Sequence, residues 1–340
     1  MNIYRRSFDR GCKPAKHLQL IAESQALQQS FNNNCDLLRS IQLCHRRWKT
    51  RLRQRGQDDA TGSHNVIMYL SNNSDFVIKT FNVFDDYVES LPHVIFIGRV
   101  ENLSKSIVYG GQVVGLDATF NITCYKTYAL YAIMGRGGGG AYPLGYFVSS
   151  SKNELAVREG LQLFKCAATE VLVSRQLMKP ENTFSPLAIC IDTDDAENLA
   201  VRRVFPNSII ILCHYHFMTS MINELRACRH DLSSENISLL LSSIRLLASA
   251  RNVETFKSIL LQIKGVSTSF YSYLETNYLC ERWVTTFSEV NRGHLSLSTQ
   301  RLCRSIMLTE VSFRTLKYII FDGYINKRLD YLLYSISYKL

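Results

Sequence analysis

The sequence predicts a mixed α/β fold with one core sheet of five strands, flanking helices and an all-helical insertion. Three observations lead to this prediction. Apolar, β-forming segments at 111–120, 126–136 and 141–151 are separated by short gaps, as in an antiparallel meander. Two more such segments, 186–192 and 208–213, alternate with helical segments, as parallel crossovers do. Region 217–300 has apolar residues at helical spacing.

Local signals support each element in turn. The Gly-rich run at 137–140 lacks a phosphate-loop pattern and is expected to be the tip of a hairpin. Asn153 can cap the helix that follows, and Pro206 stops the short helix that begins near Asp195. Three antiparallel strands followed by parallel crossovers are the succession of a ribonuclease-H-like fold.

The chain divides into five predicted parts. Residues 1–65 form a polar, basic region that is helical or partly disordered, and 66–110 form an α/β segment that precedes the core. Residues 111–216 hold the first part of the core and 217–300 the all-helical insertion. Residues 301–340 supply the final core helices.

Composition narrows the class of protein. Of 340 residues, 46% are apolar, which suffices for a large core. Lys and Arg number 39 against 29 Asp and Glu, so the net charge is +10, which suits nucleic acid or simply a soluble basic surface. The ten cysteines form no CxxC pair, and we expect a reduced, intracellular protein. With no apolar run near the roughly 20 residues of a membrane span, no membrane partner is expected.

Two aspartates end apolar strands: Asp117 follows "VVGL" and Asp192 follows "LAICI". If these strands are neighbours, both carboxylates emerge at the same end of the sheet, where a divalent cation relieves their repulsion. Oxygen ligands favour Mg²⁺ or Mn²⁺. Glu310 is the best third carboxylate, because Thr309 can cap the helix that carries it.

Cys213 and His216 form a CxxH pair directly after the last predicted strand. The pair could be half of a zinc site. Cys280 and His294 follow no common spacing for the other half, so a structural pair beside the active site is the favoured interpretation.

A basic segment precedes the core. It could hold DNA phosphates while its tryptophan packs on a base or sugar, or it could be a solvated helix face. Its members are Arg46, Arg47, Trp48, Lys49, Arg51, Arg53 and Arg55.

From about residue 95 onward the chain resembles the transposase domain of Mutator-like elements (MULE). The matching segments are "VVGLDATFNITCYKTYALYAI", "YPLGYFV", "IDTDDAENLAVRRVFPNSIIILCHYHFMTSM" and "LTEVSFRTLKYIIFDGYINKRLDYLL". The most specific piece is an Asp followed by Ala-Glu, Phe-Pro, a short strand and CxxH.

The resemblance implies a DDE triad of Asp117, Asp192 and Glu310. The second family Asp lies four residues before the Ala of the Ala-Glu pair, which selects Asp192, although Asp194 and Asp195 are close rivals. The family Glu precedes a run like "RTLK", which selects Glu310, whereas Glu281 and Glu289 precede no such run.

The function implied by the resemblance is metal-dependent DNA strand cleavage and strand transfer. A nuclear, homo-oligomeric DNA transposase that uses Mg²⁺ or Mn²⁺ is therefore expected. Residues 1–65 contain no Cys/His-rich DNA-binding finger of the kind many relatives carry. A domesticated, non-catalytic DNA-binding protein and a ribonuclease-H-like nuclease of another substrate class are the alternatives.

Overall fold

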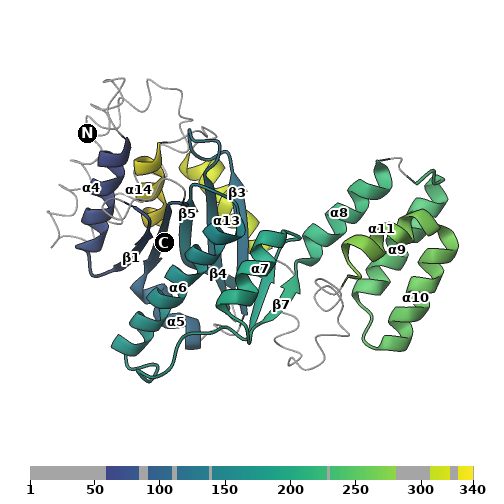
Figure 1. The fold of residues 1–340 in the computed structure, drawn as a ribbon, viewed down its shortest axis with the longest axis horizontal. Coiled ribbons are helices and arrows are strands. Elements are labelled where there is room, and N and C mark those ends of the chain that lie inside the picture. Colours follow the sequence, from purple (N-terminus) through teal and green to yellow (C-terminus); the bar gives the residue numbers. More distant parts are fainter. Residues whose placement is uncertain are drawn as a thin grey trace.

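A computed structural model describes residues 59–83, 91–108, 113–137, 140–227, 230–280, 307–321 and 328–339. Seven strands in these ranges form one mixed sheet in the order β1-β2-β5-β4-β3-β6-β7 (Figure 1). Their bounds are β1 (Phe76–Phe81), β2 (Val94–Arg99), β3 (Val113–Phe120), β4 (Ala129–Gly137), β5 (Gly140–Ser149), β6 (Ala188–Ile191) and β7 (Ile209–Leu212).

Strand pairing confirms the expected meander and crossovers. β3, β4 and β5 pair antiparallel, and β6 and β7 extend the sheet from β3 as parallel strands. Gly137 pairs with Gly140, so the Gly-rich run joins two paired strands as predicted. β2 pairs antiparallel with β5, and β1 pairs antiparallel with β2 at the edge of the sheet.

The expectation of five strands was too low by two, because β1 and β2 join the same sheet. Five of the six β2 residues are buried, so the strand has no alternation of apolar and polar residues to set it apart from a buried helix. β1 is only partly buried along its length.

Helices cover both faces of the sheet and extend beyond it (Figure 1). Their bounds are α4 (Asp59–Ser71), α5 (Val100–Val108), α6 (Glu154–Ser174), α7 (Asp195–Val204), α8 (His214–Arg226), α9 (Ser234–Ala248), α10 (Val253–Val266), α11 (Thr268–Asn277), α13 (Met307–Thr315), the π-helical turn η3 (Leu316–Ile320) and α14 (Leu329–Lys339). None of the described helices is long and apolar enough to cross a membrane.

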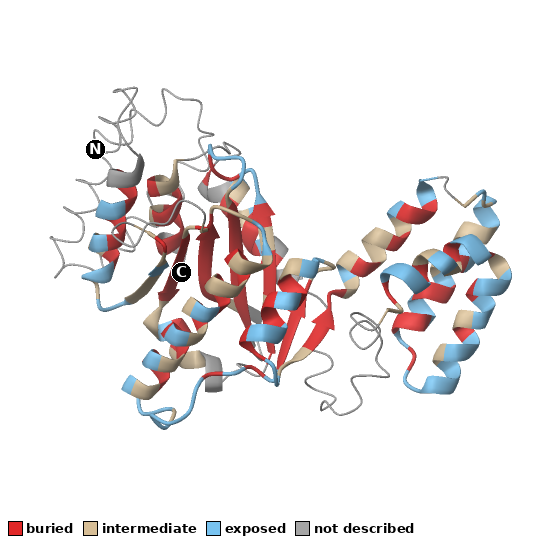
Figure 2. Ribbon diagram, viewed as in Figure 1, coloured by how far each residue is buried: buried red, intermediate tan, exposed pale blue. Residues whose placement is uncertain are grey.

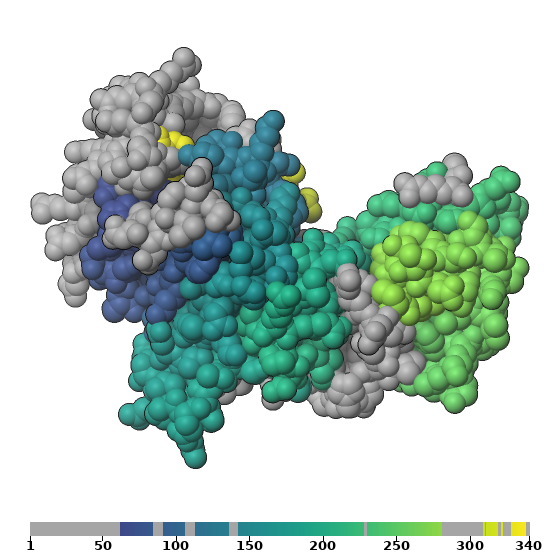
Figure 3. Space-filling model, viewed as in Figure 1, coloured from purple at the N-terminus to yellow at the C-terminus, as the bar shows by residue number. Residues whose placement is uncertain are grey.

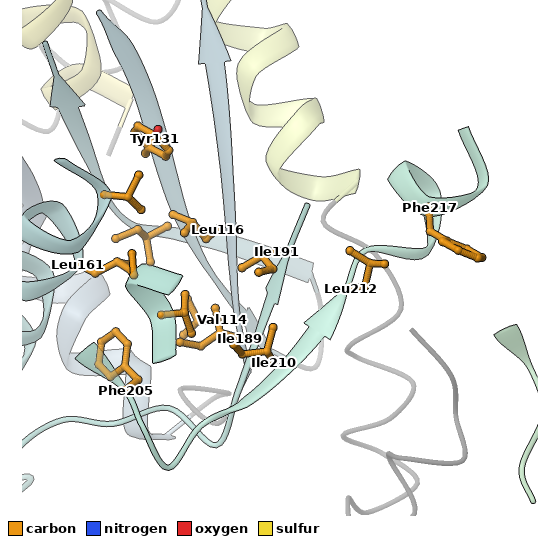
Figure 4. Close-up of a cluster of buried hydrophobic side chains, with 14 of the residues drawn as sticks. Val114, Leu116, Tyr131, Leu161, Ile189, Ile191, Phe205, Ile210, Leu212 and Phe217 are labelled. Atoms are coloured by element: carbon orange, nitrogen blue, oxygen red, sulfur yellow. The ribbon is translucent and has the colours of Figure 1, made fainter. Parts of the chain in front are cut away.

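Side-chain alternation gives the sheet two buried faces. On the first face, Val114 and Leu116 of β3 pack with α6 and α7 in one apolar cluster (Figure 4). On the second face, Leu130 and Ala132 of β4 pack with α4, α13 and α14 in another cluster. Figure 2 shows most of the sheet buried between these layers, with exposed residues on the outer sides of the helices.

Helices α8 to α11 form a helical lobe beside the sheet, in the region predicted to be an all-helical insertion. Figure 3 shows residues 230–280 as a protrusion next to the rest of the molecule. Phe217 and Met221 of α8 belong to the same apolar cluster as Leu212 of β7 and Ile244 of α9. The core of the sheet therefore continues into the helical lobe through α8.

Candidate active site

Three neighbouring parallel strands place Asp117, Asp192 and Cys213 in one row. β3 pairs with β6 as Val113 with Ala188 and Gly115 with Cys190, so the next step of the same register sets Asp117 beside Asp192. β6 pairs with β7 as Cys190 with Ile211, which sets Asp192 beside Cys213. The backbone N–H of Cys213 donates to the carbonyl of Ile191 at 2.8 Å, so the pairing continues to this level.

The row lies on the second face of the sheet. Val114 and Leu116 pack on the α6 side, so Asp117, one residue further along β3, points to the opposite side. Val113, Cys190 and Cys213 share a small buried cluster on that opposite face. Helix α13 packs against β3 and β4, and its Phe313 belongs to the apolar cluster of that face.

Nearby backbone donors stabilise both carboxylates. Asp117 is 6% exposed, and its Oδ1 accepts a hydrogen bond from the N–H of Ala118 at 2.8 Å. Asp192 is half-buried, and its Oδ1 accepts from the N–H of Thr193 at 2.6 Å and from its hydroxyl at 3.2 Å. Burying a charged group without such partners would be costly.

Asp194, the close rival of Asp192, has a different role in the structure. It is the N-cap residue of α7, and its Oδ1 accepts from the N–H groups of Ala196 at 2.7 Å and Glu197 at 3.1 Å. An N-cap carboxylate satisfies helix donors that would otherwise lack partners. Asp192, and not Asp194, therefore lies level with Asp117.

His216 lies in the first turn of α8 and contacts the row. Its Nδ1 is 3.5 Å from Oδ1 of Asp192. Burial alone lowers the pKa of His216, but the hydrogen bond with Cys213 and the charges of Asp192 and Asp117 raise it to about 9. His216 is therefore a cation beside two carboxylates at neutral pH.

Comparison with known proteins identifies this part of the chain. Residues 113–220 match a family model described as the MULE transposase domain. We refer to residues 113–220, which are similar to that family, as the MULE domain. None of the curated proteins compared with the chain matches it. The MULE domain includes Asp117, Asp192, Cys213 and His216, whereas Glu310 lies beyond its matched range.

Glu197 is a buried acid of the MULE domain that the sequence analysis used only as part of the Ala-Glu pair and not as a site residue. It lies in the first turn of α7 and is 3% exposed. Burial and the charges of Asp117, Asp194 and Asp192 raise its pKa well above the ordinary value, against a hydrogen bond with the backbone of Asp192. Its Oε2 has no hydrogen-bond partner among the described residues. The sequence signal that could have pointed to Glu197 is an acid one helical turn after the strand-end Asp192.

Helix α13 follows the MULE domain in sequence and carries Glu310. The helix begins at Met307, so the expectation that Thr309 caps it was wrong. Thr309 is instead a buried residue within the first turn. The side chain of Glu310 lies outside the part of the chain that the structure describes.

Lys317, the last residue of the "RTLK" run, is a second functional candidate that the sequence analysis did not name as a site residue. It lies in η3, directly after α13, and is half-buried. Burial lowers the pKa of Lys317, and the charge of Asp117 opposes that shift. Lys317 is therefore near enough to Asp117 for their charges to interact.

The side chains of the row indicate which kind of metal ion the site could hold. Asp117 and Asp192 offer carboxylate oxygens on adjacent strands, a chemistry that fits a hard divalent cation. Among the described residues, no group of three or more His, Cys, Asp or Glu side chains is arranged to hold a metal ion. A third ligand would have to come from outside those side chains, and Glu310 is on the helix that covers this face.

Several predicted residues fall outside the described ranges. Both Glu281 and Glu289 do so, as does His294, whereas Cys280 is described and half-buried. The basic segment also lies outside: Arg46, Arg47, Trp48, Lys49, Arg51, Arg53 and Arg55.

Proposed function

We propose that the chain is a DNA transposase of the Mutator-like class with a ribonuclease-H-like core. The strand order β5-β4-β3-β6-β7, in which only β4 runs against the other four, supports this core. The match of residues 113–220 to the MULE transposase domain supports the function.

The observation that carries the proposal is the level placement of two aspartates inside the MULE domain. Asp117 and Asp192 are 75 residues apart in the sequence, since 192 minus 117 is 75, yet the β3–β6 register makes them neighbours. We propose that Glu310 completes the triad, because α13 packs on β3 and β4 over the same face.

These three acids would hold Mg²⁺ or Mn²⁺ through oxygen ligands. Such ions, when bound, activate the attacking oxygen and stabilise the leaving oxygen of a phosphodiester. His216 would hold the carboxylate of Asp192 in place through their 3.5 Å contact. We propose a structural role for Cys213 and His216, because the sequence offers no second ligand pair at a common zinc spacing.

The partners follow from this function. DNA at the element ends and at the target would be the substrate, and the basic segment of residues 46–55 would contribute phosphate contacts. A homo-oligomer in the nucleus is the assembly that we propose for the reaction.

The first test is cleavage of a duplex that carries the DNA flanking the coding sequence, with Mg²⁺ and the full chain. Asp117→Asn, Asp192→Asn and Glu310→Gln each remove one carboxylate charge at similar size. We expect each to slow strand cleavage at least about 100-fold, equivalent to about 2.7 kcal/mol of activation free energy. Gel analysis of the cut strand measures the rate.

Asp194→Asn is the matched control, because asparagine caps a helix about as well as aspartate does. It removes a carboxylate two residues from Asp192 and should cleave within about threefold of the unaltered protein. Equal cleavage by Asp117→Asn and the unaltered protein would refute the triad.

Two other outcomes separate the alternatives. Salt-sensitive DNA binding without cleavage, unchanged by all three substitutions, would indicate a non-catalytic DNA-binding protein. Preferential cutting of RNA would indicate a nuclease of another substrate class. A separate outcome concerns the third acid. If Glu281→Gln or Glu289→Gln abolishes cleavage while Glu310→Gln cleaves normally, the third acid of the triad is Glu281 or Glu289 and not Glu310.

A further inference from the structure

Phe120 is the only phenylalanine among the described residues that is exposed, at 36% of its surface. It is the last residue of β3, three positions beyond Asp117, and pairs with Ala129 of β4. Because each residue of a strand spans about 3.3 Å, Phe120 lies about 10 Å further along β3 than Asp117. An aromatic ring therefore meets solvent at the strand end that carries the candidate active site.

The direction of Phe120 follows from the alternation along β3. Ala118 packs against the apolar cluster on the first face, so Phe120, two residues further, points to the side of α6. Asp117 points to the second face. Phe120 thus lies at the rim of the sheet and leaves the space in front of Asp117 open to a ligand.

Lys152 lies over the ring of Phe120. Its Nζ is 3.6 Å from the ring centroid, which is a cation–π contact. Strands β3, β4 and β5 lie side by side (Figure 1), and Phe120, Ala129 and Ser149 form one row across them. Lys152 follows that row by three residues, so both side chains belong to the same edge of the sheet.

The backbone on both sides of Lys152 is held by hydrogen bonds. The N–H of Ser150 donates to the carbonyl of His93 at 3.0 Å. On the other side, Oδ1 of Asn153 caps α6 by accepting from the N–H of Ala156 at 2.9 Å. The pair of Phe120 and Lys152 therefore stands on a fixed frame.

The rim around this pair is basic. Neither 118–128 nor 149–153 contains an acidic residue, and Lys126 is exposed as Lys152 is. The acid closest to Lys152 in the sequence, Glu154, is paired with Arg203 at 2.8 Å. An exposed ring with nearby cations is the combination that binds single-stranded nucleic acid, because bases stack on the ring and phosphates contact the cations.

We propose that Phe120 and Lys152 form a binding site for an unpaired nucleotide of the DNA strand that is cleaved at Asp117 and Asp192. The inference rests on the proposed function, because that function brings DNA to the strand-end aspartates. The base stacks on the ring of Phe120, and Lys152 moves from the ring to a phosphate of the same strand. The base must be unpaired, because a base inside a duplex is stacked between its neighbours.

Such a site selects the state of the DNA and not its sequence. Every base has a face that can stack on an aromatic ring, so stacking tolerates any sequence. DNA whose strands are already separated beside the cleavage point would bind best, since it has no pairing and stacking to lose.

The experiment measures DNA binding of the full chain by fluorescence anisotropy, without divalent cations so that no strand is cut. The probes are a blunt duplex and the same duplex with three unpaired nucleotides at a 3′ or a 5′ end. The unaltered protein should bind one extended duplex about tenfold more tightly than the blunt duplex. Phe120→Leu keeps an apolar side chain without a ring and should reduce this preference to less than about twofold, whereas Phe120→Tyr should retain it.

Lysine variants test the phosphate contact. Lys152→Met should lower the slope of log affinity against log salt for the extended duplex by about 0.7, and Lys152→Arg should leave it unchanged. Tyr271→Leu is the matched control, because Lys264 lies over the ring of Tyr271 at 5.0 Å in the helical lobe. This variant should retain the preference for the extended duplex.

A 2-aminopurine base in the extension reports stacking directly. Its fluorescence should fall when the unaltered protein binds and should change little with Phe120→Leu. Absence of any preference for the extended duplexes would overturn the inference, as would an equal preference in Phe120→Leu and the unaltered protein. Thermal unfolding of each variant establishes that it is folded.

Asp117→Asn separates the inference from the proposed function. This variant should bind the extended duplex at least as tightly as the unaltered protein and fail to cleave it with Mg²⁺. If Asp117→Asn cleaves normally while Phe120→Leu loses the preference, the proposed triad fails and the nucleotide site stands. If Asp117→Asn fails to cleave while Phe120→Leu binds as the unaltered protein does, only the nucleotide site is overturned.

Discussion

At the scale of single residues, Glu197 has surroundings that are unfavourable for a charge. It is buried on α7, near the strand-end aspartates, and its pKa is raised by burial and by Asp117, Asp194 and Asp192. The ring of Tyr131 is also close enough for the charge of Glu197 to raise the pKa of its hydroxyl, after the larger effect of burial. Glu197 is therefore protonated in the folded protein over a pH range where the unfolded chain ionises it.

The consequence is a pH-dependent loss of stability. A carboxyl group with a raised folded pKa contributes fully below its unfolded pKa, and that contribution is lost as pH rises through the folded pKa. Glu197→Gln removes this loss. The melting temperature of the variant relative to the unaltered protein should therefore rise as the pH is raised from about 4 to about 8. Thermal unfolding followed by circular dichroism across this range is the measurement.

Glu181→Gln serves as the control, because Glu181 is exposed. Its effect on melting temperature should vary little over the same pH range. A Glu197→Gln variant whose melting temperature follows the unaltered protein at every pH would show that Glu197 ionises normally in the folded state.

Some residues of the candidate site could be predicted from the sequence and others could not. Asp117 and Asp192 could be predicted because each ends an apolar run, and parallel strands end at the same edge of a sheet. The choice between Asp192 and Asp194 depends on the residue at which α7 begins. The pattern of apolar residues in the sequence does not determine that residue. Lys317 was not named as a site residue, because the "RTLK" run that it ends served only to locate Glu310.

At the scale of elements, helix α6 is fitted to the sheet through a glycine. A Cβ atom on Gly160 would overlap the ring of Phe147. That ring is fully buried in β5 and stacks on Tyr131, with ring centroids 4.4 Å apart. Gly160 thus lets the helix approach the strand more closely than any other residue would.

Two glycine substitutions in helices should therefore act in opposite directions. Gly160→Ala should destabilise the protein by about 1–3 kcal/mol, because overpacking a rigid core outweighs the better helix propensity of alanine. Gly265→Ala in α10 meets no atom within 4 Å and should stabilise it by up to about 1 kcal/mol. Urea unfolding of both variants measures the difference, and a stabilised Gly160→Ala protein would contradict the packing.

Elements with strong local signals were predicted well. The cap Asn153 accepts from the N–H of Ala156 at 2.9 Å, and α7 ends before Pro206, both as expected. β2 was hidden by its burial on both faces. The start of α13 was placed too late because Thr309, a typical cap residue, is instead buried inside the helix. Capping preferences are statistical, and here Thr309 is buried within the helix instead of capping it.

At the scale of the whole molecule, the net charge of +10 has a measurable consequence for DNA binding. Each neutralised phosphate releases counterions, so affinity falls with salt at a slope set by the number of contacts. Replacing six cations of residues 46–55 by glutamine should reduce the slope of log affinity against log salt by up to about 5 units. The six are Arg46, Arg47, Lys49, Arg51, Arg53 and Arg55.

Fluorescence anisotropy of a labelled duplex at several salt concentrations gives this slope. An unchanged slope would mean that residues 46–55 are a solvated face and that other cations contact the phosphates. In that case the helical lobe, with Arg245, Lys257 and Lys264, becomes the next set to replace.

The packing of α4 against α14 sets when one apolar layer of the sheet can form during synthesis. Val66 and Leu70 of α4 share one apolar cluster with Leu332 and Ile336 of α14, on the face that also carries Asp117. Translation produces α4 early and α14 only after the whole MULE domain and the helical lobe have left the ribosome. A nascent chain therefore has the two aspartates before it can complete this apolar layer of their face of the sheet. Synthesis itself delays closure of that layer until α14 has been made.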